Sequence, residues 1–92
     1  MEVKYNISAD KGHISLNEQG IEIAIINLIF KDDKLFIDST NVMPGNEGKG
    51  LGKLLVKTAV DFARKNSLKI LPICPYAKSV LAKTDEYNDV LI

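Results

Sequence analysis

The chain of 92 residues carries twelve lysines and arginines against twelve aspartates and glutamates, so its formal net charge is zero. This balance provides no global field that favours nucleic acid or a membrane surface, and any anion site must therefore be local. The length allows one sheet with one or two helices, and we expect residues 1–92 to form a single domain.

Cysteine usage and hydropathy are typical of a cytoplasmic protein without a membrane partner. The single cysteine, Cys74, cannot form an internal disulfide. The N-terminal stretch MEVKYNISAD lacks the basic start and apolar core of a signal peptide. The longest apolar stretch, IEIAIINLIF, is too short to span a membrane and contains Glu22 and Asn27.

The first half of the chain has the pattern of an antiparallel meander of about four strands. In VKYNISA (3–9), apolar and polar residues alternate, which predicts a half-buried strand, and HISLNE (13–18) is its hairpin partner. The stretch IEIAIINLIF (21–30) is apolar on both faces and predicts a central strand covered on both sides. LFIDSTNVM (35–43) follows the turn KDDK as the fourth strand.

The second half predicts a helix, a strand and a shorter helix. Seven residues at helical spacing predict the buried stripe of an amphipathic helix: Leu51, Leu54, Leu55, Thr58, Ala59, Phe62 and Ala63. LKILPIC (68–74) then predicts a strand parallel to its neighbour in the sheet, because a helix connects the two. PYAKSVLAK (75–83) predicts a second helix with Pro75 at its first position, and residues 84–92 stay unassigned. The fold class is α/β with a mixed sheet.

A glycine-rich turn, PGNEGKGLG (44–52), joins the last meander strand to the first helix. Free backbone N–H groups and the helix dipole make such a turn an anion cradle, and phosphate is the obvious guest. A P-loop does not fit, because three residues instead of four separate Gly48 from Gly52-Lys53, and Leu54 stands where serine or threonine is needed. A dinucleotide fingerprint does not fit either, because one residue instead of two separates Gly50 from Gly52.

The segment EGKGLG (47–52) resembles motif A of the GNAT N-acetyltransferase superfamily, Gln/Arg-x-x-Gly-x-Gly/Ala. The second half of the chain, from MPGNEGKGLGKLL to EYNDVL, is similar to short GNAT-like proteins of about this length. Two departures stand out. Glu47 replaces the usual glutamine or arginine, and SADKGHI (8–14) leaves room only for a hairpin where the superfamily has helices that cover the acceptor. The acceptor side is therefore expected to be open.

The resemblance implies that acetyl-coenzyme A is the cosubstrate and that no metal takes part. Its pyrophosphate would lie on the loop amides and its pantetheine arm between two strands that splay apart. Pro72 supplies a physical reason for the splay, since it cannot donate a ladder hydrogen bond, although an edge strand without a ligand also fits. The residues implied to hold the cosubstrate are Asn41, Val42, Met43, Glu47, Gly48, Lys49, Gly50, Leu51, Gly52 and Lys53.

Two catalytic candidates lie at the start of the second helix. Tyr76 resembles the superfamily's tyrosine acid in approximate location, or is a packed aromatic. Cys74 stands at the N-cap, where the dipole and the amides of Ala77 and Lys78 favour a thiolate. It is a nucleophile, a lining of the acetyl pocket, or plain packing. The oxyanion donor is expected to be the amide of Val42 or Met43.

Three functions stay open at this level. The first is an N-acetyltransferase that acts on an amine acceptor, including a protein or peptide. The second is a module that binds coenzyme A or acetyl-coenzyme A without turnover, and the third is a purely structural turn. His13 is assigned no role, and Glu22 and Asp38 are minor candidates for a general base. We expect a monomer or a weak dimer.

Overall fold

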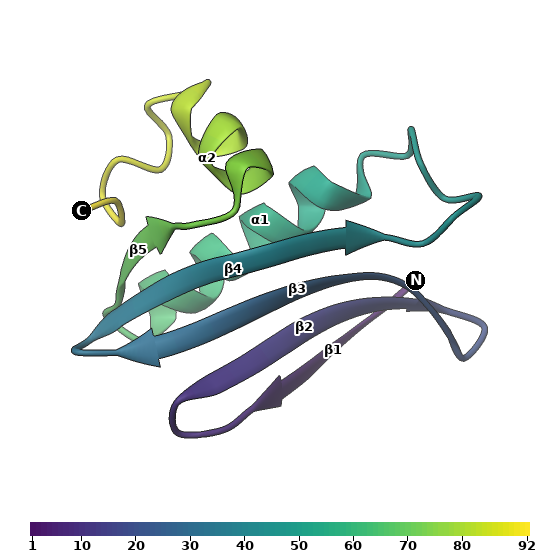
Figure 1. Cartoon of the computed structure of the whole chain (residues 1–92), viewed down its shortest axis with the longest axis horizontal. Coiled ribbons are helices and arrows are strands. Elements are labelled where there is room, and N and C mark those ends of the chain that lie inside the picture. The colour runs from purple at the N-terminus through teal and green to yellow at the C-terminus, as the bar shows by residue number, and fades with distance from the viewer.

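A computed structural model describes all residues, 1–92. Its centre is one five-stranded sheet in the order β1-β2-β3-β4-β5 (Figure 1). Strands β1 to β4 pair with one another in antiparallel fashion, and β5 is parallel to β4. The predicted meander, helical crossover and parallel strand are therefore confirmed. The elements are β1 (Glu2–Ile7), β2 (Lys11–Glu18), β3 (Ile21–Lys31), β4 (Lys34–Val42), α1 (Leu51–Lys65), β5 (Lys69–Pro72) and α2 (Pro75–Ala82).

The core lies between α1 and one face of the sheet. Helix α1 packs against β2, β3, β4 and β5, and it runs behind the sheet in Figure 1. From the sheet, Ile14, Ile26 and Ile37 are fully buried beneath it. The opposite face has no helix, and Ile29 of β3 stays partly exposed there. The prediction that the central strand is covered on both sides is thus wrong, because both helices lie off that face.

The first strand is also less buried than its alternation predicts. All six residues of β1 are exposed. Val3 and Tyr5 lie opposite the buried Leu16 and Ile14 of β2, so they face the helix side of the sheet. Tyr5 stacks on Phe62 of α1, with ring centroids 6.3 Å apart, but remains 54% exposed. A strand at the edge of the sheet extends beyond the cover that one helix can give.

The buried face of α1 is rotated relative to the predicted stripe. Leu51, Leu55, Ala59 and Ala63 are buried as predicted. The column beside them, however, is Gly52, Val56 and Val60. Leu54 is 37% exposed, and Thr58 and Phe62 are half-buried. Helix α2 packs against α1, and the contact between Tyr76 and Gly52 lies on this second column, so the second helix contributes to the rotation.

The C-terminal residues, left unassigned above, close the outer edge of β5. Ile70 forms an isolated parallel bridge with Leu91, and the Ile70 amide donates to the Val90 carbonyl at 2.6 Å. Val90 is buried. Arg64 of α1 donates two hydrogen bonds to the Asp89 carboxylate, at 2.9 and 2.8 Å. None of the helices is both long and apolar enough to cross a membrane.

Candidate functional site

Strands β4 and β5 separate halfway along β4. Their last pair is Ile37 with Pro72, and the amides of Ile73 and Cys74 both donate to the Ile37 carbonyl at 3.0 Å. Beyond this point residues 39–42 of β4 pair only with β3. Pro72 thus stands where the sequence predicts the loss of a neighbour. The result is a gap with β4 on one side and the start of α2 on the other.

The backbone of β4 presents amides to this gap. Met43 donates its amide to the Ile23 carbonyl at 2.9 Å, so this amide is already paired and is not free to stabilise an oxyanion. Val42 lies opposite Ala24 and Thr40 opposite Ile26 in a regular register. Hydrogen bonding alternates from residue to residue along an antiparallel pair, so the amides of Thr40 and Val42 point away from β3. Of the two oxyanion donors considered above, this geometry leaves Val42.

The glycine loop leaves the first turn of α1 uncapped. Gly50 is the N-cap at φ 76°, and no side chain accepts a hydrogen bond from the helix end. Gly48 has φ 78°, in the left-handed region that glycine adopts without strain. The first turn contains no acidic residue. The amides at the start of an α-helix have no partner within the helix, so those of residues 51–53 are available to an anion.

A cleft of ≈ 530 Å³ joins this loop to the end of β4. Of the residues implied to hold the cosubstrate, Asn41, Met43 and Lys49 do not line it. Thr40 and Asn46 also line it and were not predicted. The alternation of β4 places Thr40 on the same face as Val42 and was the available signal. Its lining residues are Thr40, Val42, Asn46, Glu47, Gly48, Gly50, Leu51, Gly52, Lys53 and Tyr76.

Tyr76 forms one wall of the cleft and lies across α1. A Cβ at position 52 would lie 2.6 Å from the Tyr76 hydroxyl and 2.8 Å from its ring. Gly52 therefore provides the space that the tyrosine occupies. Tyr76 is 41% exposed and lines the cleft, so it lies at the surface of the cleft and not within the core.

Glu47 also lines the cleft, but its carboxylate is turned back into the loop. Its Oε1 accepts a hydrogen bond from the Gly45 amide at 2.7 Å. Lys49 does not line the cleft and donates to Oδ1 of Asn46, which does, at 3.1 Å. The carboxylate thus closes the turn that precedes the helix, which gives a structural reason for glutamate at this position.

Cys74 lies at the gap, 7% exposed, and is the N-cap of α2. Its Sγ is 3.7 Å from Thr40 Oγ1. Burial raises the pKa of the Cys74 thiol, but hydrogen bonds with the Ala77 amide, the Thr40 hydroxyl and the Tyr76 and Thr40 amides outweigh burial and lower the pKa below its ordinary value. The Lys78 amide takes no part, since it donates to the Cys74 carbonyl at 3.0 Å.

The sequence matches the GCN5-related N-acetyl-transferase family over residues 12–90. A GCN5-like protein from Staphylococcus aureus, solved by NMR, is 36% identical. The match covers 97% of this chain and 87% of that one, with a TM-score of 0.70. A search of curated proteins finds no significant match.

Two enzymes share the fold at lower identity. The ribosomal-protein-S18-alanine N-acetyltransferase of Escherichia coli is 17% identical, with a TM-score of 0.71 over 85% of this chain and 54% of that one. The ribosomal-protein-alanine N-acetyltransferase of Brucella melitensis is 15% identical, with a TM-score of 0.69 over 83% of this chain and 61% of that one. The chain thus spans little more than half of the E. coli enzyme. With a family match over most of its length, this chain belongs to the GCN5-related N-acetyltransferases, a family of acyltransferases.

Proposed function

We propose that residues 1–92 act as one acetyl-coenzyme A-binding domain that transfers the acetyl group to an amine, in the cytoplasm. The observation that carries the proposal is the position of Thr40. It lines the cleft above the glycine loop and also contacts the Cys74 thiol. The anion cradle and the candidate reaction centre are therefore parts of one continuous site.

The donors around the cleft fit a pyrophosphate and an extended amide-containing arm. The uncapped amides of Leu51, Gly52 and Lys53 suit the phosphates, and Lys53 adds a positive charge at the same helix end. Val42 offers its backbone amide and carbonyl along the gap, where an arm with peptide-like amides can pair as a strand would. The Thr40 carbonyl points the same way, whereas the Thr40 amide is directed at the Cys74 thiol. When bound, acetyl-coenzyme A supplies an activated acetyl thioester.

The residues of the chain act on the transfer in three ways. The gap holds the thioester and the amine in register, which alone can contribute several kcal/mol, about 7 or more in well-oriented cases. The Val42 amide stabilises the oxyanion. Tyr76 supplies the proton to the departing thiolate as the amine nitrogen forms the C–N bond and the thioester C–S bond breaks. The amine gives up its proton to solvent, and solvent returns a proton to the Tyr76 phenolate.

Cys74 gives a second route to the same product. Its thiolate takes the acetyl group first, forming a new thioester and releasing coenzyme A, and the amine then attacks this thioester and restores the thiolate. Its lowered pKa and its contact with Thr40 favour this role over plain packing. The competing function is binding without turnover, which the negative charge of Glu47 near the cleft and the uncovered sheet face favour.

One assay separates these possibilities. Wild-type protein is mixed with acetyl-coenzyme A and an amine, free coenzyme A thiol is followed with time, and the protein is weighed by mass spectrometry. We expect amine-dependent thiol release and one acetyl group on the wild type that is absent from Cys74→Ala. Thiol release from Cys74→Ala at the wild-type rate would exclude the cysteine route, and binding without any release would establish the non-catalytic module.

A further inference from the structure

The uncovered face of the sheet carries a polar strip at the level of the β4 bulge. Asn6 pairs with His13, His13 with Asn27, and Asn27 with Ser39, so these four side chains form one row across four strands. Asn27 Nδ2 donates to Ser39 Oγ at 3.0 Å. The pairing of β3 with β4 shifts beside Asn27, which places Asp38 as an extra residue next to the strip.

A hollow of ≈ 540 Å³ lies along this strip. It includes three titratable side chains, those of Lys11, His13 and Asp38, and none of them forms an ion pair within the chain. Lys11 lies opposite Ile29 and Asp38 lies beyond β3, so the cation and the anion occupy different parts of the hollow. Other lining residues, such as Asn6, Ser8 and Asn27, offer amide and hydroxyl groups.

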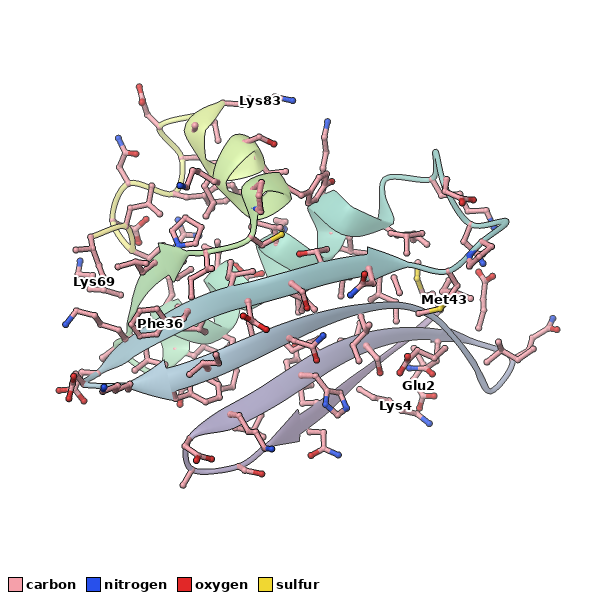
Figure 2. The ribbon with its side chains drawn as sticks, viewed as in Figure 1. Glu2, Lys4, Phe36, Met43, Lys69 and Lys83 are labelled. Carbon is pink, nitrogen blue, oxygen red and sulfur yellow. The ribbon has the colours of Figure 1, made fainter.

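The end of the hollow that contains Asp38 adjoins the gap between β4 and the start of α2. Asp38 directly follows Ile37, whose carbonyl receives the amides of Ile73 and Cys74 where β4 and β5 separate. Phe36, which is labelled in Figure 2 and precedes Asp38 by two residues in β4, lies on the face turned to the viewer, opposite Ile29, with α1 behind the sheet. A group that binds Asp38 from this face therefore lies beside the gap, and it reaches this position without entering the cleft at the glycine loop.

We propose that this hollow is a docking site for an extended polypeptide segment that presents a lysine amine to Asp38 and an acidic side chain to Lys11. A small molecule would stay largely in water on an open sheet face, whereas small-molecule sites bury most of their ligand. A polypeptide can cover the strip, and its peptide groups match the amides of Asn6 and Asn27. Acetylation of the docked lysine rests on the proposed acetyl transfer, whereas binding of the polypeptide does not depend on it.

The test is an amide NMR titration of the labelled protein without acetyl-coenzyme A. The probe is the blocked peptide alanine-lysine-alanine-glutamate-alanine at millimolar concentration, beside the same peptide with acetyl-lysine in place of lysine. We expect shifts at Asn6, His13, Asn27 and Asp38, and none in residues 48–53. Because an exposed charge pair contributes up to about 1 kcal/mol, Asp38→Asn and Lys11→Gln should each weaken binding by up to about fivefold.

Lys57→Gln, an exposed lysine on α1, is the matched control and should bind as the wild type does. The inference is overturned by an absence of shifts, by shifts centred elsewhere, or by unchanged affinity of Asp38→Asn. A separate titration with acetyl-coenzyme A reports on the glycine loop. If that titration fails while the peptide still binds at the strip, the proposed function fails and the docking site stands.

Discussion

Tyr76 and Gly52 occupy the same space at the junction of the two helices. A Cβ at position 52 would lie 2.6 Å from the tyrosine hydroxyl. Gly52 lies within α1 and has no positive φ, so its backbone does not require glycine. Glycine is required because Tyr76 leaves no room for a side chain at position 52. The size of residue 52 therefore sets the position of Tyr76, which forms one wall of the cleft.

Gly52→Ala should therefore separate function from stability. Alanine is favoured over glycine in a helix by up to about 1 kcal/mol, and the half-exposed tyrosine can swing outward, so the free energy of unfolding should be unchanged or should rise. The displaced hydroxyl should lower acetyl transfer at least about tenfold. Thermal melting and the coenzyme A release assay measure the two effects.

Gly48→Ala is the matched comparison, because glycine is required at position 48 by the backbone conformation and not by a neighbouring side chain. No atom lies within 4 Å of a Cβ at position 48, but its φ of 78° is strained for alanine. This variant should lose about 1–2 kcal/mol of stability without moving Tyr76. If Gly52→Ala keeps wild-type turnover, the position of Tyr76 has no catalytic importance.

A second prediction concerns the thiol of Cys74. Its pKa lies below the ordinary value, so the thiolate forms at lower pH than in an unstructured peptide. The rate of iodoacetamide alkylation against pH should show a correspondingly lowered midpoint. Thr40→Val removes the hydroxyl that accepts from the Cys74 thiol and can donate to the thiolate, so it should raise the midpoint, whereas Thr40→Ser should keep it. A midpoint that does not respond to Thr40→Val would show that the hydroxyl does not stabilise the thiolate.

A third prediction concerns Glu47. Glu47→Gln keeps an oxygen that can accept from the Gly45 amide and removes a negative charge near the helix N-terminus. Acetyl-coenzyme A should bind roughly two- to fivefold more tightly, with the difference shrinking as salt is added. Glu47→Ala also removes the charge, but it loses the hydrogen bond that closes the turn, so its affinity for acetyl-coenzyme A should rise less. Calorimetric titration measures all three proteins, and weaker binding by Glu47→Gln would contradict the prediction.

Local patterns were sufficient to predict the order of the elements. Alternation in the meander, helical spacing after Leu51 and proline at position 75 each act within a few residues, and the structure contains the elements they predict. The motif at residues 47–52 pointed to the family, which the comparison over residues 12–90 confirms.

The errors arise where burial depends on a distant partner. Val56 and Val60 of α1 are fully buried in the same column as Gly52, which faces Tyr76 of α2, and no pattern inside the helix shows this. Likewise, the apolar residues of β3 could not show that one sheet face stays uncovered. The contact between Thr40 and Cys74 could not be predicted, because the two residues lie 34 positions apart in the sequence.

The last prediction concerns the clamp between Arg64 and Asp89, which holds the C-terminal residues against α1. The hydrogen bonds from Arg64 lower the pKa of the Asp89 carboxyl. The same pair holds the segment in which the Val90 carbonyl accepts a hydrogen bond from the Ile70 amide. Since the folded pKa is the lower one, the stabilisation is complete above the unfolded pKa and is lost as pH falls through the folded pKa. The amides of Ile70 and Ile92 should therefore lose protection on acidification, so that they exchange faster relative to the intrinsic rate of an unstructured amide at the same pH. In Asp89→Asn it should be fast at neutral pH already, whereas Asp61→Asn, which loses only a 3.8 Å contact with Arg64, should stay close to the wild type. Equal protection in Asp89→Asn and wild type would mean that the Ile70–Leu91 bridge holds the tail without the clamp.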